Sequence, residues 1–278
     1  MTFSIVARSA DGTMHGVAVA SKFLAAGAVV AEARAEVGAL ATQAFANLAY
    51  RPQGIAMLQT GTAPADVVAA LTIADAGRAQ RQLGVVGAHG PAATFTGEEC
   101  MDWAGGIAGE DFAAQGNILT GPEVVDAIAA AWRDGEAMPF PERLLAALHA
   151  GDQAGGDRRG RQSAAVHVVG KGLGYGGTSD VAVDLRVDDH TDPVGELGRL
   201  LGIHRLLFGT PDPDTLLDLD GELAAEVREL LAKAGHHGPA TPEGLDRALS
   251  DWAGVENLEE RLVPGRVDPL VLDHLRAS

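Results

Sequence analysis

Hydrophobic residues along the chain form short apolar runs typical of strands and longer stretches with the periodicity of amphipathic helices. Strands are predicted at residues 3–8, 15–21, 37–45, 82–87, 92–96, 164–169 and 181–187. Helices are predicted at residues 52–61, 63–75, 121–134 and 141–150. This order of strands, two helices, strands, two helices and strands favours stacked antiparallel sheets with helices on their outer faces.

The first two predicted strands are joined by Asp11-Gly12, a dipeptide with a strong preference for tight hairpin turns. A turn at this place pairs residues whose numbers add up to about 23, because the turn sets the register of a hairpin. The register predicts that Ser21 or Lys22 lies beside Thr2.

The chain changes in character after Gly209. Pro211-Asp212-Pro213-Asp214 is typical of a stiff linker, and helices are predicted at 216–233 and 242–252. Residues 210–278 carry 15 acidic and 6 basic side chains, a net charge of −9. We expect an α+β domain at residues 1–210 and a small helical module at residues 211–278.

The charge of the whole chain limits the partners to be expected. The 278 residues include 38 acidic and 21 basic ones, which give a net charge of −17 and argue against a nucleic-acid partner. Apolar runs fall short of the roughly 20 residues that cross a membrane, and no signal peptide is recognisable. The single cysteine, Cys100, excludes an internal disulfide, so we expect a cytoplasmic protein.

Thr2 directly follows Met1 and precedes the first predicted strand. A small second residue permits removal of Met1, which makes threonine the amino terminus. Its hydroxyl is then a nucleophile, and its α-amine, with a pKa of about 8 in peptides, is a base on the same residue. Many proteins begin with these two residues, so Thr2 needs independent support as a catalytic residue.

Such support comes from motifs that stand in order along residues 2–205. They are Thr2-Phe3-Ser4-Ile5-Val6-Ala7, Gly16-Val17-Ala18-Val19-Ala20-Ser21-Lys22-Phe23, Ala41-Thr42-Gln43-Ala44, Arg81-Gln82-Leu83-Gly84-Val85-Val86, Gln115-Gly116-Asn117-Ile118-Leu119 and Ala154-Gly155-Gly156-Asp157-Arg158-Arg159-Gly160. Together they resemble domain-of-unknown-function family 1028. That family in turn resembles the N-terminal-nucleophile hydrolases, which implies a four-layer αββα sandwich for this chain.

The tail has a resemblance of its own. Its matching residues are Leu249, Trp252, Gly254-Val255-Glu256-Asn257-Leu258-Glu259-Glu260-Arg261 and Asp268-Pro269-Leu270-Val271-Leu272. They resemble a peptidoglycan-binding-type module. The preferred interpretation is a helical cap that packs on the core or on a neighbouring subunit. Peptidoglycan is the less favoured alternative as a partner.

A nucleophile at Thr2 needs a cation or donor near its hydroxyl, donors for the oxyanion and groups that bind substrate. Lys22 ends the paired strand and Arg34 precedes the third strand, so either could supply the cation. Ser21 could bond the terminal amine. The alternatives are an exposed charge at a strand end for Lys22 and a surface arginine for Arg34.

Three amides are candidates for the oxyanion or for substrate binding. Gln43 is a polar residue within an apolar strand, where a buried amide needs partners. Gln115 and Asn117 flank a glycine at a strand end, which suits an oxyanion hole and suits a turn equally well.

The loop at residues 154–163 is rich in glycine and charge. Asp157 could orient the terminal ammonium, and Arg159 could bind a substrate carboxylate with two hydrogen bonds. Gln162 and Ser163 are further substrate-binding candidates. A solvated basic loop is the alternative.

Asp188, His190 and Asp192 raise the question of a metal site. Asp188 and His190 share one face of a strand, and the spacing is not that of a calcium loop. A salt-bridged corner with Arg186 is the preferred interpretation, and no metal or other cofactor is predicted.

The leading hypothesis is a hydrolase that cleaves a non-peptide amide or ureido bond of a small metabolite, with Thr2 as nucleophile and base. The alternative is a non-catalytic binding or assembly protein with the same fold. Layered folds of this kind often assemble symmetrically, so a homo-oligomer is expected.

Overall fold

The structure is a computed structural model that describes residues 2–278. The chain divides into two compact units, of which the first ends at Leu201 and the second comprises Gly202–Ser278. Both residues at this division lie in α6 (Pro193–Phe208). Among the described residues, no helix is both long and apolar enough to cross a membrane.

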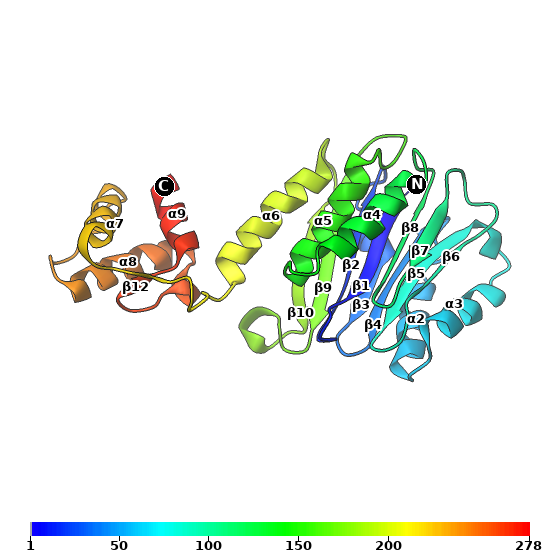
Figure 1. The fold of residues 1–278 in the computed structure, drawn as a ribbon, viewed down its shortest axis with the longest axis horizontal. Helices are drawn as coiled ribbons and strands as arrows, with labels where there is room; N and C mark the ends of the chain where they lie inside the picture. Colours follow the sequence, from blue (N-terminus) through cyan, green and yellow to red (C-terminus); the bar gives the residue numbers. More distant parts are fainter. Residues whose placement is uncertain (1) are drawn as a thin grey trace. The chain divides into compact units, whose positions relative to one another are not determined.

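Two antiparallel sheets form the centre of the first unit (Figure 1). The larger sheet contains, in spatial order, β10 (Val181–Val187), β9 (Ser163–Gly170), β2 (Met14–Ser21), β1 (Thr2–Arg8), β8 (Phe112–Asn117) and β7 (Gly105–Ala108). The smaller sheet contains β3 (Ala31–Arg34), β4 (Gly38–Ala44), β5 (Arg81–Gly87) and β6 (Ala93–Thr96). The predicted mixed fold with antiparallel sheets is thereby confirmed.

Helices pack on both sheets, on the faces that the sheets turn away from each other. They are α2 (Tyr50–Gln59), α3 (Pro64–Ile73), α4 (Glu123–Asp134) and α5 (Phe140–Gln153). Ile128 of α4 and Leu144 of α5 share a core with Ile5 of the larger sheet. In the smaller sheet, Leu83 packs with side chains of α2 and α3, including Leu71.

Alternation along β1 decides which side chains face the second sheet. Phe3 and Ile5 belong to the core under α4 and α5, whereas Val6 belongs to the apolar set between the sheets. Because successive side chains of a strand point to opposite faces, Thr2 and Ser4 share the inter-sheet side with Val6. The start of β1 therefore presents hydroxyl groups to the space between the sheets.

The β1–β2 hairpin forms at the predicted place. Asp11 Oδ1 accepts hydrogen bonds from Ser9 Oγ at 2.6 Å and from the backbone amide of Thr13 at 3.0 Å. Gly12 adopts a φ of 73°, which glycine tolerates without strain. The strands pair from Phe3 with Ala20 onward, so the predicted register, in which paired numbers add up to 23, is confirmed.

Several elements were not predicted, and all but one of them are short and lack a clear sequence pattern; the exception is α6, whose apolar spacing was overlooked. They are α1 (Ala26–Val30), β3, β7, α6 and the 3-10 turns η1 (Arg78–Gln80) and η2 (Tyr175–Gly177). β7 begins with two glycines, and α1 spans only 5 residues, too few to display helical periodicity.

The second unit is the predicted helical region at the C-terminal end. Its elements are β11 (Leu217–Asp218), α7 (Gly221–Lys233), α8 (Pro242–Glu256), η3 (Glu259–Arg261), β12 (Arg266–Val267) and α9 (Pro269–Ala277). The prediction that the first helix begins at residue 216 was wrong, because Leu217 and Asp218 pair with β12 instead. Trp252 of α8 is at the centre of the unit's own core.

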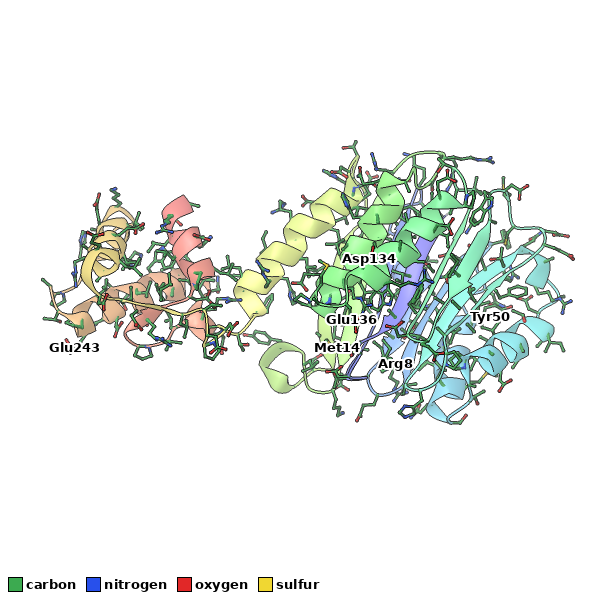
Figure 2. All side chains as sticks on the ribbon, in the orientation of Figure 1. Arg8, Met14, Tyr50, Asp134, Glu136 and Glu243 are labelled. Atoms are coloured by element: carbon green, nitrogen blue, oxygen red, sulfur yellow. The ribbon has the colours of Figure 1, made fainter. Side chains whose placement is uncertain are left out.

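Because His15 is buried, we expect the stability of the protein to depend on pH. His15 of β2 is 0% exposed, and burial, together with the charge of Arg8 at the end of β1 (Figure 2), lowers its pKa to about 4. An unfolded histidine has a pKa of about 6.5, so below that pH protons bind preferentially to the unfolded chain. We expect the unfolding free energy to fall by about 2 kcal/mol between pH 7 and pH 4.5 from this residue alone.

Urea unfolding at the two pH values measures this effect. The variant His15→Gln has no titrating group at this position. Its free energy of unfolding should therefore fall by about 2 kcal/mol less than that of the native chain between pH 7 and pH 4.5. His149→Gln, at an exposed position of α5, is the control and should keep the native pH dependence. An unchanged pH dependence in His15→Gln would contradict the assignment.

Candidate functional site

Thr2 is the first residue of β1, which lies between β2 and β8 in the larger sheet. Its Oγ1 lies 3.1 Å from Oγ of Ser21, a hydrogen bond in which either hydroxyl can donate. On the other side, Thr2 pairs with Asn117 of β8. Thr2 and Ser21 are both buried, so the sheet holds two hydroxyl groups together at one end.

A network of buried polar side chains connects the two sheets next to Thr2. Ser4 Oγ donates to Gln43 Oε1 at 2.6 Å, and Gln115 Nε2 donates to Ser4 Oγ at 2.7 Å. Gln82 Oε1 accepts from the amide groups of Gln43 and Asn117, both at 2.8 Å. All five side chains are at most 1% exposed. The network joins β1 and β8 of the larger sheet to β4 and β5 of the smaller one.

This network also fixes the backbone of Thr2. The carbonyl oxygen of Thr2 accepts from Gln43 Nε2 at 3.2 Å and from Asn117 Nδ2 at 3.5 Å. One of these amides comes from the smaller sheet and the other from the larger sheet. The position of the threonine hydroxyl therefore depends on how the two sheets are held together.

Gln82 is a central member of the network that the sequence analysis missed. Its Nε2 donates to the carbonyl oxygen of Gly116 at 2.7 Å and to Thr96 Oγ1 at 2.9 Å. Nearby, a Cβ on Gly84 would lie 2.1 Å from Oε1 of Gln115, so glycine makes room for the amide there. The signal that identified Gln43, an amide inside an apolar strand, is equally present at Gln82.

The loop before β9 supplies charged groups around the end of β2. Asp157 accepts hydrogen bonds from the backbone amides of Lys22 and Arg159, both at 2.8 Å. Arg161 binds Asp152 with two hydrogen bonds of 2.7 and 2.8 Å. Lys22 Nζ donates to the carbonyl oxygen of Arg161 at 3.2 Å. The carboxylates are buried, whereas the cationic side chains of Lys22 and Arg159 reach the surface, where Arg159 Nη2 also bonds Asp157 at 3.4 Å.

Gln162 and Ser163 follow this loop. Ser163 Oγ donates to the carbonyl oxygen of Phe23 at 2.6 Å and accepts from the backbone amide of Ala26 at 3.0 Å. Gln162 Nε2 donates to Asp189 at 3.2 Å. Ser163 thus holds the segment after β2, and Gln162 lies at the exposed side of the same segment.

Arg34 is placed at the other end of the sandwich. It pairs with Gly38 at the start of β4, and its Nη1 donates to Gln59 Oε1 at 2.9 Å. Gln43, which contacts Thr2, lies five residues further along β4, about 17 Å away at the usual rise of a strand. The structure therefore brings Ser21 to Thr2, places Lys22 one residue beyond Ser21, and leaves Arg34 apart from this site.

A second charged cluster lies beside the end of β4. Arg81 Nε binds Asp75 at 2.8 Å, and Asn47 and Tyr50 (Figure 2) also donate to Asp75, each at 2.9 Å. These bonds, that of Arg81 foremost, hold the pKa of Asp75 well below its usual range, and burial raises the pKa of Tyr50 to about 12. Arg81 also stacks over Phe45. The cluster fixes the loop that follows Gln43 in a defined position.

The acidic segment after β10 gives no sign of a metal site. Within residues 2–278, no three side chains of His, Cys, Asp or Glu come together in a way that could hold a metal ion. The predicted partner of Arg186 was wrong: Arg186 pairs with Asp184 at 3.5 Å. Asp184 and Arg186 both belong to β10 and lie on one face of it, whereas the strand ends at Val187, before Asp188 and His190.

Two family models match the chain. One is described as "Family of unknown function (DUF1028)" and matches residues 2–197. The other is described as "Putative peptidoglycan binding domain" and matches residues 207–275. Both resemblances predicted from the sequence are confirmed.

A solved structure is similar as well, whereas no curated protein matches. It is the crystal structure of protein SPO2555 from Silicibacter pomeroyi, which is itself described as DUF1028. The similarity has a TM-score of 0.66 at 31% sequence identity and covers 80% of this chain and 88% of that one. Since the DUF1028 model spans residues 2–197, the chain belongs to the DUF1028 family, and its C-terminal part is similar to a peptidoglycan-binding domain.

Proposed function

We propose that this protein is an amidohydrolase in which Thr2, freed by removal of Met1, is the nucleophile. The reaction is hydrolysis of a non-peptide amide or ureido bond in a small metabolite. Met1 lies outside the described residues, so the proposal stands on Thr2 and its surroundings. The observation that carries it is the threonine hydroxyl at the start of a central strand, 3.1 Å from Ser21 Oγ and braced by a network from both sheets.

The arrangement of layers supports the same proposal. Helices, larger sheet, smaller sheet and helices follow one another in space, and the terminal threonine begins a strand of the larger sheet (Figure 1). N-terminal-nucleophile hydrolases, which the sequence motifs resemble, combine an αββα sandwich with a nucleophile at this place. Fold alone does not determine function, so the weight rests on Thr2.

Each step of the proposed reaction uses groups of the terminal residue. The Oγ1 of Thr2 attacks the carbonyl carbon, and its proton passes to the α-amine. The tetrahedral intermediate then breaks its C–N bond, and the leaving nitrogen takes the proton from the ammonium group. Water attacks the resulting ester, which restores the threonine and releases a carboxylic acid from an amide substrate or a carbamic acid from a ureido substrate.

The neighbouring residues receive roles that agree with their contacts. The side-chain amides of Gln43, Gln115 and Asn117 already donate to groups of the protein, so we assign them to positioning Thr2 rather than to contact with the oxyanion. Asp157 holds the backbone of Lys22, which directly follows Ser21, the neighbour of Thr2. Arg34 has no role in this proposal.

An exposed cationic loop next to the nucleophile suits a substrate with a carboxylate. Arg159 and Lys22 expose their charged groups although the protein as a whole has a net charge of −17. Because arginine binds carboxylates with two parallel hydrogen bonds, we assign Arg159 to the substrate's acid group.

Intact mass spectrometry with a β-lactone tests the proposal without knowledge of the substrate. The purified chain is expected to lack Met1 and to gain one adduct, which peptide mapping places on Thr2. Retention of Met1 without an adduct would favour the non-catalytic binding or assembly protein, because a blocked threonine has no free α-amine.

A further inference from the structure

The second unit contains a cavity of about 200 Å³ between α7, the loop that follows it and the beginning of α8. Figure 2 labels Glu243, which directly precedes Gly244 of the cavity wall. A Cβ on Gly238 would lie 2.1 Å from the carbonyl oxygen of Gly244, so glycine permits the close approach of loop and helix here. The cavity is thus shaped by a specific backbone contact.

Arg228 is the one residue with a formal charge among those that line the cavity, and that charge is positive. Arg228 of α7 and His236 and His237 of the loop contribute to the wall, and none of the nine lining residues is acidic. This contrasts with the surrounding sequence, since residues 210–278 carry a net charge of −9 from 15 acidic and 6 basic residues. A wall with a guanidinium group and no carboxylate, within an acidic unit, favours an anionic ligand.

Arg228 retains a buried donor for such a ligand. Its Nη2 donates to the carbonyl oxygen of Thr241 at 3.2 Å, whereas its Nε is buried and has no hydrogen-bond partner among the described residues. The acids near it in sequence are engaged elsewhere, Glu226 with Arg276 at 2.7 Å and Glu229 with Lys233 at 2.8 Å. A buried guanidinium nitrogen without a partner is costly, and a bound oxygen atom would satisfy it.

We propose that this cavity binds a small carboxylate, with Arg228 as the residue that pairs with the acid group. His236 and His237 are further donors at the same wall, and Leu231 and Leu245 offer apolar contact to a small side chain. The volume suits one amino-acid-sized group rather than a large ligand. The carboxylate could belong to a free small acid or to the C-terminal residue of a short peptide. This binding site does not depend on the function proposed for Thr2.

Isothermal titration of the full chain with N-acetyl-alanyl-alanine tests the site, and the matching C-terminal amide is the comparison ligand. We expect the acid to bind with a dissociation constant on the order of 1 mM, as is usual for a ligand of this size, and the amide at least about tenfold more weakly. Propionate is the third ligand: binding comparable to that of the peptide would identify a free small acid as sufficient. Binding of all three ligands is measured on the native chain, so this comparison does not depend on whether a variant folds.

Variants then locate the binding. Arg228→Met should weaken binding of the acid at least about tenfold, and Arg228→Lys, which keeps the charge, should weaken it less. Arg247→Met, at an exposed position of α8 outside the cavity wall, is the matched control and should bind like the native chain. Equal binding of acid and amide, undiminished binding by Arg228→Met, or no binding of any of the three ligands would each overturn the proposal.

Discussion

Replacing Thr2 by alanine is expected to abolish acylation of the chain by a β-lactone. Alanine lacks the hydroxyl that attacks the carbonyl carbon, and loss of a nucleophile lowers rates by at least about 1,000-fold. The fold should persist, because the substitution removes the hydrogen bond between Thr2 Oγ1 and Ser21 but keeps the bonds from Gln43 and Asn117, which go to the backbone carbonyl of Thr2.

Alanine is also the right replacement for the terminal chemistry. It is as small as the enzyme that removes Met1 requires, so the variant and the native chain have the same free α-amine. Thr2→Ser keeps a hydroxyl and should still form the adduct, whereas Thr178→Ala, at an exposed position far along the chain, should react like the native protein. The measurement is the rate of adduct formation by intact mass.

Equal rates for Thr2→Ala and the native chain would mean that another residue carries the adduct, and Thr2 would lose its proposed role. Ser21 is the nearest hydroxyl, so Ser21→Ala belongs in the same series. We expect Ser21→Ala to slow acylation by roughly tenfold rather than abolish it, since it loses one hydrogen bond to the nucleophile.

The sequence predicted the long elements of the first unit because their signals are local. The Asp11-Gly12 turn fixes the β1–β2 register without reference to the rest of the chain, and this register brings Ser21 to Thr2. Short elements such as α1 offer too few residues for a periodic pattern. α6, by contrast, has apolar residues at helical spacing, including Val194, Leu197 and Leu201, and this signal was overlooked.

The site was only partly predictable because its contacts join distant segments. Gln43 was identified as a buried amide, but its bonds to Ser4 and Gln82 depend on how two sheets are stacked, which no hairpin register determines. The same limit explains Arg34. Its position before a strand suggested the neighbourhood of Thr2, yet β4 runs so that Arg34 and Gln43 lie at opposite ends.

Gln82→Leu is expected to destabilise the first unit by about 4 kcal/mol. Leucine has a similar size but removes the shortest hydrogen bond of the Gln43 and Asn117 amides, and it removes the side-chain donor of the Gly116 carbonyl oxygen. Buried polar groups that lose a partner cost about 1–3 kcal/mol each. Because Gln82 is 0% exposed, water cannot replace these bonds unless the sheets separate.

Urea unfolding followed by the fluorescence of Trp103 and Trp132 measures this loss in the first unit. Trp252 belongs to the second unit, so Trp252→Phe is used as the background for every chain in the series. The matched control is Gln59→Leu, at an exposed position of α2, with an expected change of less than about 0.5 kcal/mol. If Gln82→Leu changed the free energy of unfolding as little as the Gln59→Leu control, the inter-sheet network would contribute little to stability.

The same variant separates positioning from stability. Gln82 does not contact Thr2 directly, but it orients Gln43 and Asn117, whose amides bond the carbonyl oxygen of Thr2. If the network positions the nucleophile, folded Gln82→Leu should acylate at least about tenfold more slowly than the native chain under conditions where both are fully folded. If Gln82→Leu is destabilised but acylates at the native rate, Thr2 keeps its reactive geometry without the complete network. The role of the network would then be to hold the sheets together and not to position Thr2.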